Sequence, residues 1–220
     1  MKFHRRTSLK FLAFAPFCSS WLTSAPSAQP LAKTARLRPT PQDVEGLHYP
    51  KAWRGDVDND LTTFNGKKYQ RGIPMTLSGL IRTENGAILK NARVEIWQID
   101  DAGEYRHPDF GGEGPANRGF QGYGRMQTTD SGRYLFNTIK PIGYSGRPPH
   151  VHFKVIADGH QSLITEMYFA GDNAEGSLWQ KLFGGFSNER DLLTVSPTIN
   201  RAGSVETLDV VFDIVLENSA

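Results

Sequence analysis

The stretch GYSGRPPHVHFKV, residues 143–155, contains a conformationally restricted Arg-Pro-Pro segment followed by a predicted strand, and the fold prediction starts from it. From His150 to Val155 the side chains alternate and include β-branched and aromatic residues, which predicts a β-strand. Because alternate residues of a strand face the same side, His150 and His152 share one face. Two such imidazoles can bind one metal ion, but a bare His-x-His also fits two surface or core histidines. The pair therefore needs further ligands before it indicates a site.

Further strands are expected on both sides of this stretch, bounded by turns that contain glycine. They are expected at 75–82, 92–99, 125–129, 133–139, 150–157, 163–169 and 208–216. The sequence Asp130-Ser131-Gly132 separates two of these segments and predicts a hairpin. Short strands at regular spacing favour an all-β protein, a β-sandwich with long loops and an extended N-terminal arm. A helical turn is expected at 178–183.

Residues 1–28 have the order of regions found in export signals. A basic segment with the pair Arg5-Arg6 precedes an apolar run at 11–17, and small residues follow. This order predicts a signal peptide of the twin-arginine type, cleaved near Ala28. The chain would then use the twin-arginine export machinery and be periplasmic or secreted. The apolar run is shorter than the roughly 20 residues of a spanning helix, so a membrane anchor is the less favoured alternative.

Removal of the signal segment changes the charge of the chain. The segment contains Lys2, Arg5, Arg6 and Lys10 and no acidic residue, which leaves 21 basic and 23 acidic residues and a formal net charge of −2. A nearly neutral chain without a run of basic residues does not have the charge pattern expected of a nucleic-acid-binding protein. The single cysteine, Cys18, lies in the signal, so the mature chain would form no disulfide bond.

The residues after the signal divide into an arm and a domain. Residues 29–60 are rich in proline and polar residues and are expected to form an extended arm. Residues 61–220 then form one β-sandwich domain that would carry the chemistry. Since an arm and exposed sheet edges favour assembly, a homo-oligomer is one expectation.

Two tyrosines extend the candidate ligand set. Tyr144 lies six residues before His150, and Tyr105 ends the turn that follows the strand around 94–98. Each tyrosine alone also fits a packed side chain with a hydrogen-bonded hydroxyl. Two imidazoles with two phenolates would favour Fe(III), because phenolate is a hard anionic donor. Zinc sites more often use cysteine or carboxylate, and Fe(II) oxygenases more often use two histidines and one carboxylate.

Five runs of the chain resemble those of intradiol ring-cleavage dioxygenases, in the branch of protocatechuate 3,4-dioxygenase and its beta subunit. The runs are DVDNDLT at 56–62, ARVEIWQ at 92–98, GEYRH at 103–107, YLFNTIKP at 134–141 and RPPHVHF at 147–153. The resemblance implies a mononuclear non-haem Fe(III) held by four side chains. These are Tyr105, Tyr144, His150 and His152. It also implies that a catechol ring is opened between its hydroxylated carbons by O2, which gives a cis,cis-muconate-type product.

The resemblance also implies a second role for Tyr144 and roles for two further positions. Tyr144 would leave the metal as the catechol binds, and Arg147 would stabilise negative charge on the substrate ring, although Arg147 also fits a structural ion pair. Glu166 stands where the related enzymes have a glutamine near the substrate, and there it would disfavour an anionic substituent. A solvated, outward carboxylate is its alternative. Only Ser145 and Gly146 separate Tyr144 from Arg147, where protocatechuate enzymes have a longer insert, so a more open pocket is expected.

Three functions follow from these observations. The first is an exported intradiol dioxygenase, favoured by the complete ligand set with Arg147. The second is a non-catalytic exported β-sandwich that binds iron or a catecholate, and the third is a zinc hydrolase that uses the same histidines. Asp56, Asp58 and Asp60 alternate as in a calcium loop, but the glycine and later glutamate of that motif are absent, so a structural turn is expected.

Overall fold

The computed structural model describes residues 36–43, 45–50, 54–107, 112–172 and 189–218. The predicted signal at 1–28 and the helical turn expected at 178–183 lie outside these residues. Within the described part of the chain, no helix combines the length and the apolar character needed to cross a bilayer.

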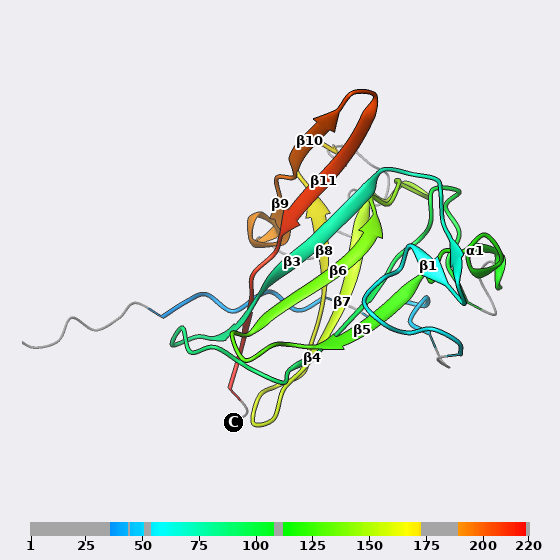
Figure 1. Ribbon diagram of the computed structural model, residues 1–220. Coiled ribbons are helices and arrows are strands. Elements are labelled where there is room, and N and C mark those ends of the chain that lie inside the picture. Colours follow the sequence, from blue (N-terminus) through cyan, green and yellow to red (C-terminus); the bar gives the residue numbers. More distant parts are fainter. Residues whose placement is uncertain (1–35, 44, 51–53, 108–111, 173–188, 219–220) are drawn as a thin grey trace, which may run out of the picture. The chain divides into compact units, whose positions relative to one another are not determined.

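Two five-stranded sheets pack on each other as a β-sandwich, which confirms the predicted fold class (Figure 1). The first sheet contains β10 (Thr198–Ala202), β11 (Val205–Val211), β3 (Pro74–Thr83), β12 (Ile214–Leu216) and, paired with β3, β6 (Arg133–Ile139). The second has the order β5 (Tyr123–Gln127), β4 (Arg93–Trp97), β7 (His150–Ile156), β8 (Leu163–Phe169) and β9 (Thr194–Val195). The remaining elements are short: β1 (Thr63–Phe64), β2 (Lys67–Lys68), α1 (Gly114–Asn117) and the 3-10 helix η1 (Arg190–Leu193).

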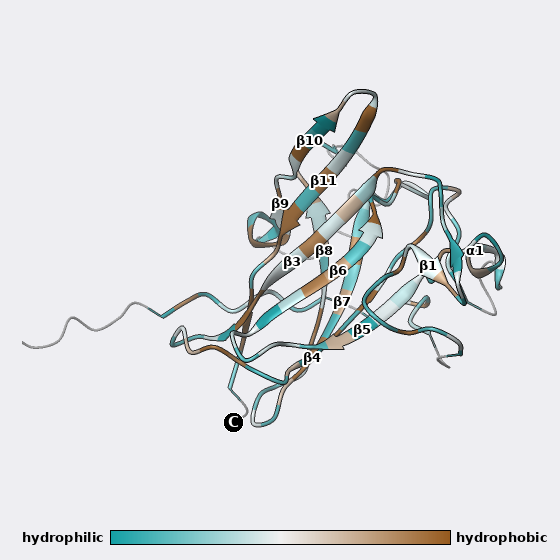
Figure 2. Ribbon diagram, in the orientation of Figure 1, coloured by the Kyte–Doolittle hydropathy of each residue, from teal (hydrophilic) through white to brown (hydrophobic). Residues whose placement is uncertain are grey.

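Alternating side chains build the core between the sheets. Buried and more exposed residues alternate along β3, and Figure 2 shows the corresponding hydrophobic and hydrophilic bands. On β7, Val151, Phe153 and Val155 are fully buried in this core. Since successive residues of a strand face opposite sides, His150 and His152 lie on the outer face of the second sheet. The candidate metal ligands are therefore separated from the sandwich core by one sheet.

The strands on either side of Asp130-Ser131-Gly132 do not pair with each other, so the predicted hairpin is wrong. The turn exists, and the Gly132 N–H donates to the Thr129 carbonyl at 2.8 Å. However, β5 pairs with β4 and β6 pairs with β3, so the chain crosses from one sheet to the other at this turn. A turn signal is local, whereas each strand takes the partner that buries its own apolar face.

The strand expected at 208–216 is divided into β11 and β12, which both run parallel to β3. At the break, the Phe212 N–H donates to the Ser78 carbonyl at 2.8 Å, and the Leu80 N–H donates to Asp213 Oδ1 at 2.9 Å. Gly79 permits this close approach, because a Cβ there would lie 2.1 Å from the Phe212 carbonyl oxygen. The expected strands do not include β10, whose five residues are all exposed and carry no apolar periodicity.

The described residues of the arm run along the sandwich of the same chain. The Thr40 N–H donates to the Val215 carbonyl at 3.0 Å, and the Asp43 N–H donates to the Ile164 carbonyl at 2.8 Å. This path carries the arm across the edge of the second sheet and onto its outer face. There a Cβ on Gly46 would lie 3.8 Å from Cε1 of His152. The arm therefore covers the face that presents the two histidines.

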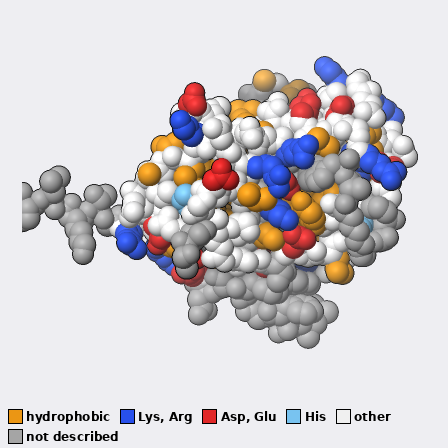
Figure 3. Space-filling view, turned by 90° about the horizontal axis from the view of Figure 1, so that it is seen from below, with side chains coloured by type: hydrophobic (Ala, Val, Ile, Leu, Met, Phe, Trp, Pro, Cys, Tyr) orange, Lys and Arg blue, Asp and Glu red, His pale blue; other side chains and the backbone are white. Residues whose placement is uncertain are grey.

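The aspartates at the end of the arm form a structural turn, as expected. Asp58 Oδ1 accepts the Asp60 N–H at 2.9 Å, and Asp60 Oδ1 accepts the Thr62 N–H at 3.0 Å. On the face drawn in Figure 3, basic side chains lie close to acidic ones in several places.

Candidate metal centre

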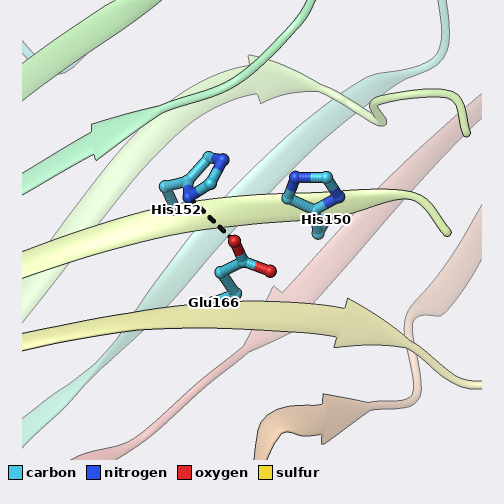
Figure 4. Close-up of side chains that lie close together, drawn as sticks. All are labelled: His150, His152 and Glu166. Atoms are coloured by element: carbon cyan, nitrogen blue, oxygen red, sulfur yellow. Dashed lines mark ion pairs between the residues drawn. The ribbon is translucent and has the colours of Figure 1, made fainter. Parts of the chain in front are cut away.

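Strand β7 presents two imidazoles side by side (Figure 4). His150 and His152 are both buried, at 2% and 0% exposure. His152 is paired in register with Trp97 on β4, and the two rings stack with centroids 4.8 Å apart. The Nδ1 of His150 lies 2.7 Å from the Pro148 carbonyl oxygen, so Nδ1 carries the proton. The lone pair of His150 is therefore on Nε2, on the side that faces Tyr105.

A buried carboxylate shapes the loop that carries Tyr105. Asp100, which follows β4 and is 0% exposed, accepts the N–H groups of Ala102 and Glu104 at Oδ1 at 2.9 and 3.1 Å. Its Oδ2 accepts a hydrogen bond from the guanidinium of Arg118, whose Nε lies 3.1 Å away. This turn directs Tyr105, which is 4% exposed, back over the outer face of the sheet.

A tight turn carries Tyr144. The Arg147 N–H donates to the Tyr144 carbonyl at 2.8 Å, which closes the four-residue turn. The two central residues, Ser145 and Gly146, have φ of 48° and 76°, the values of a type I′ turn. The short connection noted in the sequence is thus the turn itself. It places the Tyr144 hydroxyl 3.4 Å from Nη1 of Arg147.

The four predicted ligands converge on one point. The Tyr105 hydroxyl oxygen lies 3.2 Å from the Tyr144 hydroxyl, 3.4 Å from His150 Nε2 and 3.0 Å from His152 Nε2. Donors that share one transition-metal ion at bond lengths of about 2.1 Å lie about 3 to 3.5 Å apart. The separations and donor types therefore fit a mononuclear site of two phenolates and two imidazoles.

The protonation of the buried groups agrees with metal binding. Burial lowers the pKa of His150 to about 4, against the opposing effect of Glu166, and burial also holds the pKa of His152 well below its usual value. Both imidazoles are therefore neutral near pH 7 with a lone pair to donate. Burial, with the neighbouring Tyr144, raises the pKa of Tyr105 well above its usual value. Its phenolate thus requires a nearby cation, which a bound metal ion supplies.

A second donor set shares the two histidines. Ligand atoms of His150, His152 and Glu166 lie within 4.8 Å of one another, which resembles a site of two histidines and one carboxylate. However, Glu166 Oε1 lies 3.2 Å from Nδ1 of His152, whereas the Nε2 of His152 faces Tyr105. One ion cannot bind both nitrogens of the same ring. Because His150 also offers Nε2 toward Tyr105, the geometry favours the tyrosine set and leaves Glu166 behind His152.

Glu166 pairs with Arg147 in this structure. Nη2 of Arg147 lies 2.7 and 2.5 Å from the two carboxylate oxygens, and the Tyr168 hydroxyl donates to Oε2 at 2.5 Å. Both residues proposed for substrate binding therefore lie beside the ligand set and contact each other. Glu166 is 1% exposed, which excludes the solvated alternative weighed for it from the sequence.

His48 also lies at the site and was missed by reasoning from the sequence. Its ring stacks on Tyr105 with centroids 4.1 Å apart and planes 8° apart. Burial, with the nearby His107 and Arg147, lowers the pKa of His48 to about 4, so the ring is neutral. No spacing rule links His48 to the four candidate ligands, because the path of the arm in the folded chain brings His48 onto Tyr105.

Comparisons with known proteins agree with this geometry. A protein-family model described as Dioxygenase matches residues 44–218. The protocatechuate 3,4-dioxygenase beta chain of Burkholderia cepacia is 35% identical over 174 residues, which cover 74% of this chain and 72% of that relative. The catechol 1,2-dioxygenase of Acinetobacter baylyi is 35% identical over 151 residues, which cover 60% of this chain but only 47% of that relative.

Solved structures show the same fold. The dioxygenase domain of a carbohydrate-binding fusion protein from Streptomyces sp. SirexAA-E has a TM-score of 0.59 and 26% identity, and the match covers 83% of this chain and 100% of that one. Catechol 1,2-dioxygenase from Acinetobacter sp. ADP1 has a TM-score of 0.64 and 25% identity, with coverage of 82% and 63%.

Proposed function

This chain belongs to the intradiol dioxygenase family, and on that premise we propose that it opens a catechol ring between the two hydroxyl-bearing carbons with O2. Both oxygen atoms would enter the product, a cis,cis-muconate-type diacid. The observation that carries the proposal is the convergence of four donor atoms from two loops and one strand. They belong to Tyr105, Tyr144, His150 and His152.

These four side chains would hold one non-haem ferric ion. When bound, the ion would supply Lewis acidity toward the catechol and O2. Tyr105 is buried between His48 and the sheet, so it would keep its place throughout. Tyr144 is only partly buried and stands on a two-residue turn at the rim. It is therefore the donor with room to move aside, and its Oη would accept a proton from a catechol hydroxyl.

Arg147 would stabilise negative charge on the substrate ring. Its Nη2 is held by Glu166, while its Nη1 points toward the Tyr144 hydroxyl at 3.4 Å. A group that displaces the Tyr144 ring would meet this N–H. A fixed guanidinium needs little reorganisation as charge develops, which is the condition for electrostatic catalysis.

The first experiment is the visible spectrum of the purified protein with its iron content, before and after anaerobic addition of catechol. A tyrosinate-to-iron band that shifts with catechol, followed by uptake of one O2 per catechol, would support the proposal. Tyr105→Phe should abolish or strongly shift the band. Tyr123→Phe, in the same aromatic cluster but outside the donor set, should leave it unchanged.

Other results would separate the alternatives. A protein that stays colourless after reconstitution with iron would contradict the ferric site and favour a zinc hydrolase. A coloured protein that binds catechol without O2 uptake would favour a non-catalytic exported binder of iron or catecholates.

We also propose that the protein is exported to the periplasm or beyond by the twin-arginine route. The support is the order of basic, apolar and small residues before Ala28. Fractionation of cells should recover the shortened chain outside the cytoplasm. Replacement of Arg5 and Arg6 by lysine should retain the full-length chain inside.

A further inference from the structure

We propose that Glu166 restricts this enzyme to catechols without an anionic ring substituent, because its carboxylate compensates the charge of Arg147 beside the metal donors. The inference rests on the proposed function and narrows its substrate class.

The ion pair between Arg147 and Glu166 is short and almost fully buried. Nη2 of Arg147 lies 2.7 Å from Oε1 and 2.5 Å from Oε2 of Glu166. The side chains are 13% and 1% exposed, so water screens the pair only weakly. Close pairs of this kind are strong and directional, and they hold both partners in one position.

One further hydrogen bond and a close imidazole surround the carboxylate. The Tyr168 hydroxyl donates to Oε2 at 2.5 Å, and Nδ1 of His152 lies 3.2 Å from Oε1. Glu166 therefore accepts hydrogen bonds from a guanidinium and a phenol and lies close to an imidazole nitrogen. A glutamine in the same place would offer one oxygen and turn an NH2 group toward at least one of these donors. The arrangement suits a carboxylate better than an amide.

Within the described part of the chain, the charge of the cation beside the donor set is already compensated and does not favour a substrate carboxylate. Among the described residues in contact with the donor set, Arg147 and Glu166 carry opposite charges that cancel. Of the cations farther along this face, Lys154 lies 3.0 Å from Glu45, and Arg190 packs 4.3 Å from the centre of the Tyr168 ring. An anionic substituent would lose its hydration without gaining an uncompensated partner.

The test is anaerobic titration of the iron-loaded protein with protocatechuate and with its methyl ester, followed in the visible band. The two ligands share the catechol ring and differ in the charge of one substituent. The wild-type protein should bind the ester at least about tenfold more tightly than the acid. Glu166→Gln should reduce this preference by about tenfold, because the carboxylate that compensates the charge of Arg147 is then removed.

Two further variants separate charge from structure. Glu166→Asp keeps the charge and should keep the preference for the ester. Glu95→Gln should also keep it, because Glu95 is equally buried, at 2% exposure, but pairs with Tyr49 and Arg93 away from the donor set.

The inference is overturned if the wild-type protein binds the acid as tightly as the ester, or if Glu166→Gln leaves the ratio unchanged. The ratio of the affinities for the ester and the acid can be measured on the wild-type protein, so the inference can be refuted even where Glu166→Gln does not fold. In both cases the ligands would still shift the visible band, and the proposed function would stand. If neither ligand shifts the band and catechol supports no O2 uptake, the proposed function fails and the inference fails with it.

Discussion

Replacement of Asp100 by asparagine should loosen the loop that presents Tyr105. Asparagine would still accept the N–H groups of Ala102 and Glu104 at its oxygen. Its NH2 group, however, would face the guanidinium of Arg118, which now lies against the Asp100 carboxylate. Two donors would then oppose each other in a buried position, and the ion pair would be lost.

The size of the effect follows from the exposure of the two partners. Removal of one member of a fully buried pair costs about 3–5 kcal/mol of unfolding free energy. Asp100 is 0% exposed, but Arg118 is 30% exposed and keeps Glu104 as a partner at 2.8 Å. We therefore expect a loss of about 2–3 kcal/mol. Asp101→Asn is the matched control, because its amide oxygen can still accept from the Tyr69 hydroxyl and its ion-pair partner Arg71 is 59% exposed, so it should lose about 1 kcal/mol or less.

Urea denaturation followed by circular dichroism would measure both variants, with the m-value expected to stay constant. The Asp100→Asn protein should also release iron more readily, since the loop that carries Tyr105 is less rigid. A double-mutant cycle with Arg118→Met would isolate the pair and should give a coupling of about 1–2 kcal/mol. Equal losses in Asp100→Asn and Asp101→Asn, or a coupling near zero, would refute the reasoning.

Three further predictions concern other parts of the chain. His48→Ala should lower the affinity for iron and shift the tyrosinate band, because it removes the ring stacked on Tyr105. His48→Phe keeps an aromatic ring, so its iron affinity and its band should stay closer to those of the wild-type protein. A His48→Ala protein with an unchanged spectrum would exclude a role for the stack. Gly79→Ala should destabilise the fold by about 3 kcal/mol or more in urea denaturation, because the new Cβ meets the Phe212 carbonyl oxygen; a near-neutral variant would show that β3 and the C-terminal strands are not this close. Burial, with the nearby Asp213, raises the pKa of Tyr134, so its contribution to stability should be constant below the unfolded pKa of about 10 and fall by about 1.4 kcal/mol per pH unit above it. Tyr134→Phe should remove that share of the slope, and an unchanged slope in the variant would contradict the assignment.

Much of the site could be predicted from the sequence because its parts are local. The alternation from His150 to Val155 predicts that both histidines share a face, and the structure places them so. Only two residues separate Tyr144 from Arg147 in the sequence, and they form the turn that sets Tyr144 beside Arg147. Each of these features depends on backbone geometry over a few residues.

Other features lay beyond reasoning of this kind. The environment of Glu166 could be narrowed only to two alternatives, a residue near the substrate or a solvated one, and neither described its contacts with Arg147 and His152. No pattern along the chain pointed to His48, because nothing in residues 36–50 specifies which sheet face the arm will cross. These positions depend on contacts between segments more than a dozen residues apart.

The sequence by itself determined most of the strand segments that build the core, which faces of those strands are apolar, and which side chains can serve as metal ligands. These properties follow from the two-residue period of a strand and from the chemistry of each side chain. Only the tertiary structure decided that β5 and β6 join opposite sheets, that the arm brings His48 onto Tyr105, and that Glu166 holds Arg147. The physical reason is that burial acts between surfaces that are distant in the chain, and the pairing that buries most apolar area with its polar groups satisfied is chosen by the whole fold.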